Sequence, residues 1–549
     1  IEIDRYMLAG PFSWPKIIAL LNRDFIPVRE APTKLLSEKF NLRTYAFVEP
    51  GFLVIKSDGQ VAGRVDRLTT LPPSWLLQLF ARFRSSDPEK GDADASIWSL
   101  AQDSAARAMF ERFMADPHRG EVDLTAFDAP LENRGQQLEA QLMKGMIQYY
   151  AGNHDGARVT WRGAMEIDVE SPLAWKAAAE REGFGPFVRG FEVHGPLPAV
   201  AQEAGIRSLG SAAPPESYSE MDLWRRSVQF LLSMQRENGA LIDSDYDFGG
   251  TDSLPNVHVA VTSLVGLSLM DARKRLPEKA EVIDAALERA AVFVRDAKNI
   301  NTVDRDEILW AYAYRLRFLT ARLRWKKESL KAINDAVEKL EGVQGNRGSW
   351  YHEYSSSFVT ATALLALADA KQAGATVNQQ VVDKGLQSLL RDRYANGAYP
   401  YSSVRGNRAN SNAEGDIAAS AGRMPICELA LLLWGKSDQS RLQFAIEQSL
   451  EHHDKLNVAY KYDNHTSTLA YGGFFFWYDM QSRAEAIQNL TDLDARSAAA
   501  RQHQQLVLAL PEIDGCFVDS HELGRCYGTA MGLLSMNALT NVLEPSTNR

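Results

Sequence analysis

The sequence predicts a multidomain, mainly α-helical protein whose last three-fifths form a closed ring of six helical hairpins. Three observations support this fold class. The 549 residues are too many for one compact core. From Met221 onward, charged amphipathic helices alternate with helices that are rich in small, uncharged residues. Glycines in the turns between these helices recur at one or two multiples of about fifty-five residues, as expected of a repeat protein.

The predicted ring occupies the end of a chain with four regions. We expect an α/β domain in residues 1–88, a helical connector in 89–205, a linker in 206–220 and the ring in 221–549. The linker is predicted from the small, polar and proline-containing stretch Ser208–Ser219.

Composition narrows the classes of partner. With 45% hydrophobic and 24% charged residues and no uninterrupted apolar stretch of about 20 residues, the chain is not expected to span a membrane. The net charge of −10 and the lack of a long Lys/Arg block argue against nucleic acid as a partner. Because the chain starts at Ile1 and enters strand-like sequence at once, we expect a processed leader or an upstream segment to have been removed. Export and the compartment stay open.

The first eighty residues alternate between strand-like and helical patterns. The expected elements are strands at Ile1–Leu8 and Phe25–Arg29, a helix at Ser13–Asn22, a hairpin of Phe52–Lys56 and Val61–Val65, and a helix at Ser74–Phe83. This order resembles a thioredoxin-like domain, with Glu49-Pro50 where that family has its cis-proline and Gly10–Trp14 where it has Cys-x-x-Cys. The cysteines are absent, so the domain cannot carry out thiol-disulfide exchange.

The connector contains a helical hairpin. The stretch Gly145–Ala164, followed by Pro172, resembles one tetratricopeptide repeat. A single repeat cannot bury its apolar face alone, so we expect either a neighbouring helix within Ile97–Met114 or packing on a flanking domain. We expect this hairpin to cap or space the domains, with binding of another protein through the thioredoxin-like and helical regions as the alternative.

Twelve helices are predicted in the ring. The charged, outer helices are expected at Met221–Gln235, Lys279–Ala297, Glu328–Val343, Gln379–Arg393, Ser440–Leu456 and Leu493–Leu510. The inner helices are expected at Val257–Arg273, Glu307–Leu323, Ser356–Lys371, Ile417–Trp434, Tyr471–Leu490 and Leu523–Leu539.

Four turns carry a related motif. They are Gln235-x3-Gly239, Gln344-x3-Gly348-x-Trp350, Arg393-x3-Gly397 and Pro511-x3-Gly515. The second is a complete Gln-x3-Gly-x-Trp, the QW motif of squalene-hopene-type cyclases, and the region resembles the terpene cyclase and protein prenyltransferase repeat superfamily. The resemblance implies an (α/α)6 toroid in which this motif ties outer helices together, so it points to a fold and not to a reaction.

The catalytic motifs of that superfamily are missing. No Asp-x-Asp-Asp is present, and Gly524-Arg525-Cys526 has glycine where the prenyltransferase zinc site has aspartate. We therefore assign no cofactor. A divalent metal remains open through Cys526, His521 and His465, whose residue types bind zinc. Cys516 and Cys526 are expected either to be free thiols or, in an oxidising compartment, to form a disulfide.

The fold predicts where a site lies. All inner helices of such a ring begin at one rim, so their N-termini and the preceding loops converge there. Four of the ten histidines fall at this rim, together with tyrosines and carboxylates, which suits acid-base chemistry. The catalytic candidates are His352, His465, Tyr471, His521, Tyr354 and Asp463. The substrate-binding candidates are His258, Asp306, Arg405, Asp416, Arg423, Arg525, Trp310 and Trp477.

Other readings of these residues are structural. The carboxylates Asp306, Asp416 and Glu522 are well placed to cap helices. Arg423 and Glu428 lie in an apolar segment, and an ion pair across inner helices is the expected reason. The aromatic residues of Trp310–Tyr314 and Phe474–Tyr478 are expected to divide between packing and lining a cavity.

Three functions are compatible with these patterns. The first is a toroid that binds or processes an extended ligand, either a glycan or an isoprenoid. If this toroid is an enzyme, we expect a lyase, a hydrolase or a cyclase-type transferase. The second is a non-catalytic scaffold for protein interaction, which the degraded motifs favour. The third is a diverged terpene cyclase or prenyltransferase. Convergence of His352, His465 and His521 on one open volume would favour the first.

Overall fold

The computed structural model describes most of the chain in two compact units. The first consists of residues 1–202 and 207–216, and the second of residues 203–206 and 217–549. The residues described are 12, 14–28, 33–40, 52–65, 76–77, 80–81, 83, 98–101, 103–115, 123–151 and 153–181 in the first unit, and 218–244, 246, 253–403, 413–456, 460, 475–512, 515–520 and 523–544 in the second. These residues form nineteen α-helices, so the chain is mainly helical.

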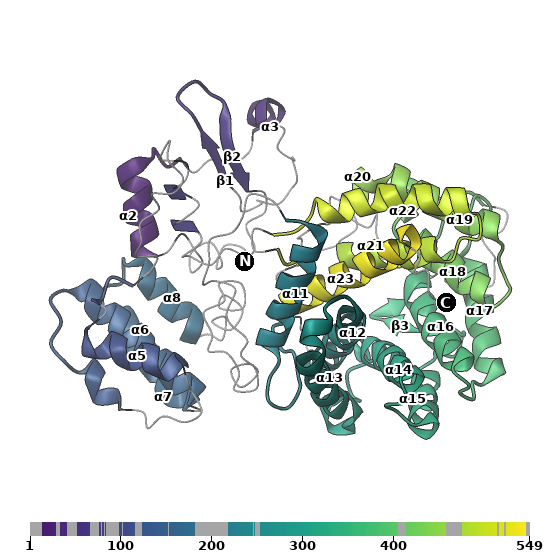
Figure 1. The fold of residues 1–549 in the computed structure, drawn as a ribbon, viewed down its shortest axis with the longest axis horizontal. Helices are drawn as coiled ribbons and strands as arrows, with labels where there is room; N and C mark the ends of the chain where they lie inside the picture. The colour runs from purple at the N-terminus through teal and green to yellow at the C-terminus, as the bar shows by residue number, and fades with distance from the viewer. Residues whose placement is uncertain are drawn as a thin grey trace. The chain divides into compact units, whose positions relative to one another are not determined.

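The first unit begins with a helix and a hairpin. Helix α2 (Pro15–Asp24) is followed by α3 (Lys34–Phe40) and by the antiparallel strands β1 (Phe52–Ile55) and β2 (Val61–Val65) (Figure 1). The predicted helix and hairpin are confirmed, and the described residues of Ser74–Phe83 are helical. Strand Ile1–Leu8 and the proposed cis-proline at Glu49-Pro50 lie outside the described residues.

The prediction of a strand at Phe25–Arg29 is wrong for its described part. Residues 25–28 are not in a strand, and Phe25 caps the C-terminus of α2 through its backbone N–H to Leu21 O. The Phe25 ring lies 5.6 Å from the Phe80 ring, in an edge-on arrangement. Phe25 is thus held by an aromatic neighbour, whereas Ile26 and Val28 are exposed to solvent.

The rest of the first unit is helical. It contains α5 (Ala105–Ala115), α6 (Arg134–Tyr150), α7 (His154–Ile167) and α8 (Pro172–Arg181), and α6 packs on both α5 and α7. The predicted helical hairpin is thus present as α6 and α7. Gly145 permits their close approach, because a Cβ at this position would lie 2.2 Å from the Trp161 indole nitrogen. The predicted neighbouring helix is α5.

In the second unit, the outer and inner helices occur in the predicted order. The outer helices are α11 (Glu220–Met234), α13 (Ala280–Arg295), α15 (Leu330–Gly342), α17 (Gln379–Asp392), α19 (Gln439–Glu451) with α20 (His453–Leu456), and α22 (Leu493–Leu508). The inner helices are α12 (Leu254–Arg275), α14 (Ile308–Arg324), α16 (Ser357–Gln372), α18 (Met424–Leu433), α21 (Phe476–Gln488) and α23 (Gly524–Leu543). Two predicted helices are interrupted, one at His452 and the other before Met424, where a 3₁₀ turn precedes α18.

The four related turns have the same backbone structure. In each, the glycine is in the left-handed region, with φ between 80° and 90° at Gly239, Gly348, Gly397 and Gly515. In each turn, the glycine N–H donates to the carbonyl oxygen of the residue three positions earlier. The N–H of that earlier residue donates to the carbonyl oxygen of the residue after the glycine. The carboxamide nitrogen of Gln344 donates to Gly348 O and to Val381 O on α17, both at 2.8 Å. Gln235 donates in the same way to Gly239 O and Ala286 O, so the motif joins neighbouring outer helices.

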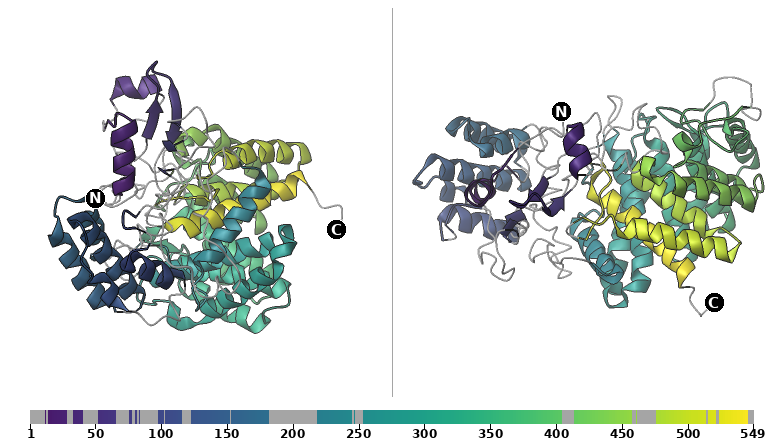
Figure 2. Two further views of the ribbon diagram at one scale, coloured as in Figure 1. Left: turned by 60° about the vertical axis from the view of Figure 1, so that its left-hand side comes forward. Right: turned by 90° about the horizontal axis from the view of Figure 1, so that it is seen from above.

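The six inner helices contact one another in a cyclic order. The packing pairs are α12 with α14, α14 with α16, α16 with α18, α18 with α21, and α21 with α23. Helix α23 also packs on α12, so the series returns to its start. Figure 2 shows the helices of the second unit, coloured teal to yellow, from two further directions. Within the described residues, no helix has the length and apolar character needed to cross a lipid bilayer.

Candidate functional site

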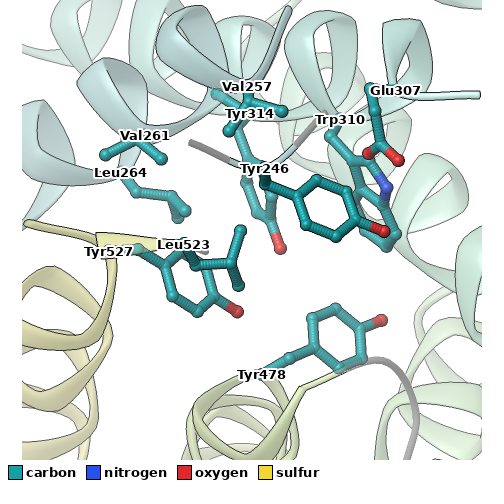
Figure 3. Close-up of a pocket in the computed structure, with 11 residues that line it drawn as sticks. Tyr246, Val257, Val261, Leu264, Glu307, Trp310, Tyr314, Tyr478, Leu523 and Tyr527 are labelled. Atoms are coloured by element: carbon teal, nitrogen blue, oxygen red, sulfur yellow. The ribbon is translucent and has the colours of Figure 1, made fainter. Parts of the chain in front are cut away.

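A pocket lies among four of the inner helices. About 380 Å³ of space among its lining residues is free of protein atoms, and this volume includes space that is open to solvent. Its lining, of which Figure 3 labels all but Ala260, comes from α12, α14, α21, α23 and the loop after α11: Tyr246, Val257, Ala260, Val261, Leu264, Glu307, Trp310, Tyr314, Tyr478, Leu523 and Tyr527. The lining residues of the helices lie in their first halves or just before them. The pocket therefore opens among the N-terminal ends of the inner helices.

The wall of the pocket is aromatic. Trp310 and Tyr314 are one helical turn apart on α14, and their rings are nearly parallel, 17° apart with centroids at 6.0 Å. The Tyr478 ring from α21 meets Trp310 at 76° and 5.8 Å. Tyr246 and Tyr527 complete the wall, and each packs edge-on against Phe475. Figure 3 shows these rings surrounding one volume from different helices.

Three tyrosines of this wall are kept in the neutral form by burial. Burial raises the pKa of Tyr314, Tyr478 and Tyr527, because a phenolate in an apolar environment is poorly solvated. The Tyr478 hydroxyl bonds to Thr362 Oγ1 at 2.7 Å and donates to Phe358 O at 3.2 Å. These groups therefore offer π faces and hydroxyls, and no negative charge.

Glu307 brings a carboxylate to the pocket. It precedes the first residue of α14, and its side chain is 2% exposed, as is that of His352. The His352 Nδ1 lies 3.1 Å from Glu307 Oε1 and 3.2 Å from the Asp306 carbonyl oxygen. Two acceptors this close place a proton on Nδ1, so the Trp310 indole N–H at 3.5 Å is a weak contact.

A second carboxylate lies on the other side of the imidazole. Glu353 Oε1 is 3.7 Å from His352 Nε2, and its side chain is 22% exposed. Burial acts against the charged imidazolium, but Glu307, Glu353 and the Asp306 carbonyl outweigh it, so the pKa of His352 is raised. Burial and the neighbouring carboxylates raise the pKa of Glu353, which His352 partly offsets.

A short hairpin positions His352. Strands β3 (Tyr351–His352) and β4 (Tyr354–Ser355) pair as neighbours, with Glu353 alone at the turn. Glu353 has φ of 56°, a conformation that non-glycine residues rarely adopt. The turn is short because His352 and Tyr354 are direct cross-strand partners. Backbone strain of this kind persists where the surrounding structure holds the residue in place.

Charged side chains bridge the inner helices beyond the tyrosines. Arg317, one turn after Tyr314, bonds to Asp369 on α16 at 3.0 Å and to Glu485 Oε2 on α21 at 3.1 Å. Burial raises the pKa of Asp369, whereas that of Glu485 is lowered because Arg317 outweighs the effect of burial. Arg317 thus links α14 to both α16 and α21.

The structure brings three predicted site residues together. Trp310 and Asp306 both contact His352 Nδ1, Trp310 through its indole N–H and Asp306 through its carbonyl oxygen. His258 is next to the lining residue Val257, and its Nε2 is 3.2 Å from Ser244 O. Tyr354 lies on the hairpin, where its ring is 6.0 Å from that of Tyr401, and its pKa is raised by burial.

Other predicted residues lie elsewhere. The Trp477 indole donates to Val518 O at 2.9 Å and packs on Phe517, away from the pocket lining. The buried Arg525 guanidinium lies 4.5 Å from the Phe230 ring of α11. Arg423 donates from Nε to Tyr399 O at 2.9 Å, and burial lowers its pKa to about 10.

Two structural expectations need correction. The ion pair of Glu428 does not run between two inner helices: Glu428 accepts a hydrogen bond from Tyr399 OH at 2.6 Å and pairs with Arg393, at the end of the outer helix α17. The arginine at the end of α17 is closer because α17 and α18 pack together. Asp306 does not cap α14: the helix begins after Glu307 without a side-chain cap, and the Asp304 carboxylate accepts from the N–H groups of Asp306 and Glu307 just before it.

Asp416 does act as a cap. Its carboxylate accepts from Ala419 N at 3.0 Å, in the 3₁₀ turn Ala418–Ser420. Five candidate site residues lie outside the described residues, and so does the proposed cap Glu522: His465, Tyr471, His521, Asp463 and Arg405. The expected convergence of His352 with His465 and His521 stays a prediction.

The cysteines are free thiols in the structure. Cys427, Cys516 and Cys526 are all buried, so the alternative of a Cys516–Cys526 disulfide is not formed. Burial raises the pKa of each thiol. Within the described ranges, no three His, Cys, Asp or Glu side chains gather in an arrangement that could hold a metal ion.

Comparisons with known proteins give no assignment. No protein-family model matches the chain, and no curated protein sequence matches it. Its function is therefore argued from its geometry.

Several lining residues were not singled out from the sequence. Tyr246 lies in the loop after α11, where no repeated pattern marks it. Tyr527 is one residue after Cys526, a candidate metal ligand, and no local pattern shows that it faces the pocket. Glu307 was not selected as a site residue either. The signal that could have found it is its position, directly before the helix that brings Trp310 and Tyr314 to the same pocket.

Proposed function

We propose that the second unit is an (α/α)6 toroid whose central pocket binds an extended, apolar ligand of isoprenoid type. Support for the toroid comes from the cyclic packing of the inner helices and from the repeated glycine turns. The lining of the pocket carries the proposal: five aromatic and five aliphatic residues around one carboxylate.

An apolar chain suits this lining better than a glycan. A sugar carries a hydroxyl on nearly every carbon, and each one buried without a partner costs about 1–3 kcal/mol. Aliphatic residues such as Val257, Val261 and Leu264 cannot provide those partners. A branched hydrocarbon instead gains about 25 cal/mol per Å² of apolar surface that it buries.

The Glu307 and His352 pair gives the pocket an acid-base group. Glu307 lines the pocket, and His352 Nδ1 holds a proton 3.1 Å from its carboxylate. A carboxyl group that shares a proton with a buried imidazole can give a proton to a ligand or take one from it. The proposed activity is therefore ligand binding, with proton transfer at Glu307 as the chemistry that this pair supports.

The test is binding of farnesol, a fifteen-carbon isoprenoid alcohol, to the full chain by calorimetric titration. We expect farnesol to bind and maltohexaose not to bind. Val261→Phe places a ring in the pocket and should abolish farnesol binding, whereas Val292→Phe, at an exposed position of α13, should leave it unchanged. Binding of maltohexaose in place of farnesol would contradict the proposal, and binding of neither would favour the scaffold function.

A further inference from the structure

The pocket combines π faces with a carboxylate in a way that bears on the charge of its ligand. Trp310 and Tyr314 are nearly parallel and Tyr478 is nearly perpendicular to Trp310, so the three rings form a corner. Aromatic faces arranged around a corner attract a cation through their quadrupoles, and tryptophan does so most strongly. A neutral hydrocarbon needs apolar walls but not this arrangement.

The charge of the lining points the same way. Among the described lining residues, Glu307 carries the carboxylate and the others are aromatic or aliphatic. Figure 3 shows the Glu307 carboxylate beside the Trp310 indole. His352 neutralises one negative charge, but Glu307 and Glu353 lie on its two sides, so the three groups together remain negative. This residual charge favours a positive group in the pocket.

We propose that the ligand of this pocket carries an alkylammonium group, held against Trp310, Tyr314 and Tyr478 beside Glu307. The inference rests on the proposed function, since the apolar chain of the ligand occupies the aliphatic part of the pocket formed by α12. A tertiary or quaternary ammonium fits best, because its alkyl substituents contact the rings while its charge stays unscreened by bound water. Polyamines and metal ions, which are strongly hydrated, fit less well.

The experiment compares two probes of equal chain length on the full chain: decyltrimethylammonium, below its micelle concentration, and 1-decanol. Titrations in about 0.3 M NaCl screen attraction to the exposed acidic surface, since the Debye length is then below about 10 Å. We expect decyltrimethylammonium to bind about tenfold more tightly than 1-decanol, as expected for a cation on desolvated aromatic faces.

Two variants locate the effect. Glu307→Gln keeps the shape of the side chain and removes its charge, and it should remove most of the preference for the cation. The control Glu338→Gln, at an exposed position of α15, removes the same charge far from the lining and should preserve the preference. Trp310→Leu keeps an apolar wall without the π face and should also reduce the preference, which gives a second test should Glu307→Gln fold poorly.

Each outcome separates the two proposals. If both probes bind equally and Val261→Phe blocks both, the pocket is apolar and the ammonium inference is wrong while the proposed function stands. If neither probe binds, both proposals are wrong. A preference for the cation that survives both Glu307→Gln and Trp310→Leu would place the cation elsewhere and overturn the inference.

Discussion

Two buried histidines should make the stability of the second unit depend on pH in opposite directions. The first is His352, whose side chain is 2% exposed and lies between Glu307 and Glu353. Replacing it with leucine leaves Glu307 buried without this cation. Removal of one partner from a buried ion pair costs about 3–5 kcal/mol.

The size of the expected change in melting temperature follows from the size of the unit. An unfolding entropy of about 2.1 cal/mol/K per residue gives about 0.7 kcal/mol/K for residues 217–549. A loss of 3–5 kcal/mol therefore corresponds to a fall of about 4–7 °C at pH 6. Differential scanning calorimetry of the full chain measures this shift.

The sign of the pH dependence follows from the pKa of His352. Because its pKa in the folded state is raised, the stability that it adds is fully present below the unfolded pKa of about 6.5. That stability is lost as the pH rises through the folded-state pKa. The gap between wild type and His352→Leu should therefore narrow between pH 6 and pH 9, by at most about 1.4 kcal/mol per pH unit.

His503 should behave in the opposite way. It is fully buried, its Nδ1 accepts from Arg483 Nε at 3.2 Å, and its Nε2 faces Met480 O at 2.8 Å. Burial, with the Arg483 charge as the second cause, lowers its pKa well below the usual value. Stability from this group is lost as the pH falls below about 6.5, so His503→Gln should flatten the loss in acid. A gap for His352→Leu that stays constant or widens toward pH 9 would refute the reasoning.

Three further predictions test the fold around the pocket. Gly348→Ala should destabilise the folded protein more than Gly374→Ala. Both glycines have positive φ, but only a Cβ at Gly348 would meet a carbonyl oxygen, that of Lys384, at 2.4 Å. Equal melting temperatures of the two variants would contradict this. Gln344→Ala should cost about 1–3 kcal/mol in thermal unfolding through the loss of two hydrogen bonds, and the exposed Gln380→Ala much less. Ellman's reagent should label none of the three cysteines in the native protein and all three after unfolding, so a native thiol that reacts at once would show that burial does not protect it.

The helices of the second unit could be predicted from the sequence because their patterns are local. All the predicted outer and inner helices are present, and their ends differ from the predictions by a few residues except where a helix is interrupted. The turn glycines were equally predictable, since positive φ selects glycine and the same spacing recurs. The order in which these helices pack could also be predicted, because the alternation of the two kinds of helix agreed with the spacing of the turns.

The pocket was harder to predict, because its lining depends on which side of each helix faces the pocket. Trp310 and Tyr314 share a face of α14 by their spacing, and both line the pocket. Trp477 and Tyr478 are consecutive residues of one helix, so their side chains point in different directions. Tyr478 lines the pocket and Trp477 does not, and no local pattern distinguishes them. The partner of Glu428 could not be predicted either, because Arg393 reaches it only through the packing of α17 on α18.

A crystal structure of the full chain with farnesol is the most direct test of the central claim, that an apolar ligand binds within a ring of inner helices. The account predicts a closed ring of six inner helices and electron density for the alcohol between Trp310, Tyr314, Tyr478 and Val261, with Glu307 in contact with it. Farnesol bound at another surface, or a pocket filled by side chains in crystals that contain farnesol, would contradict it.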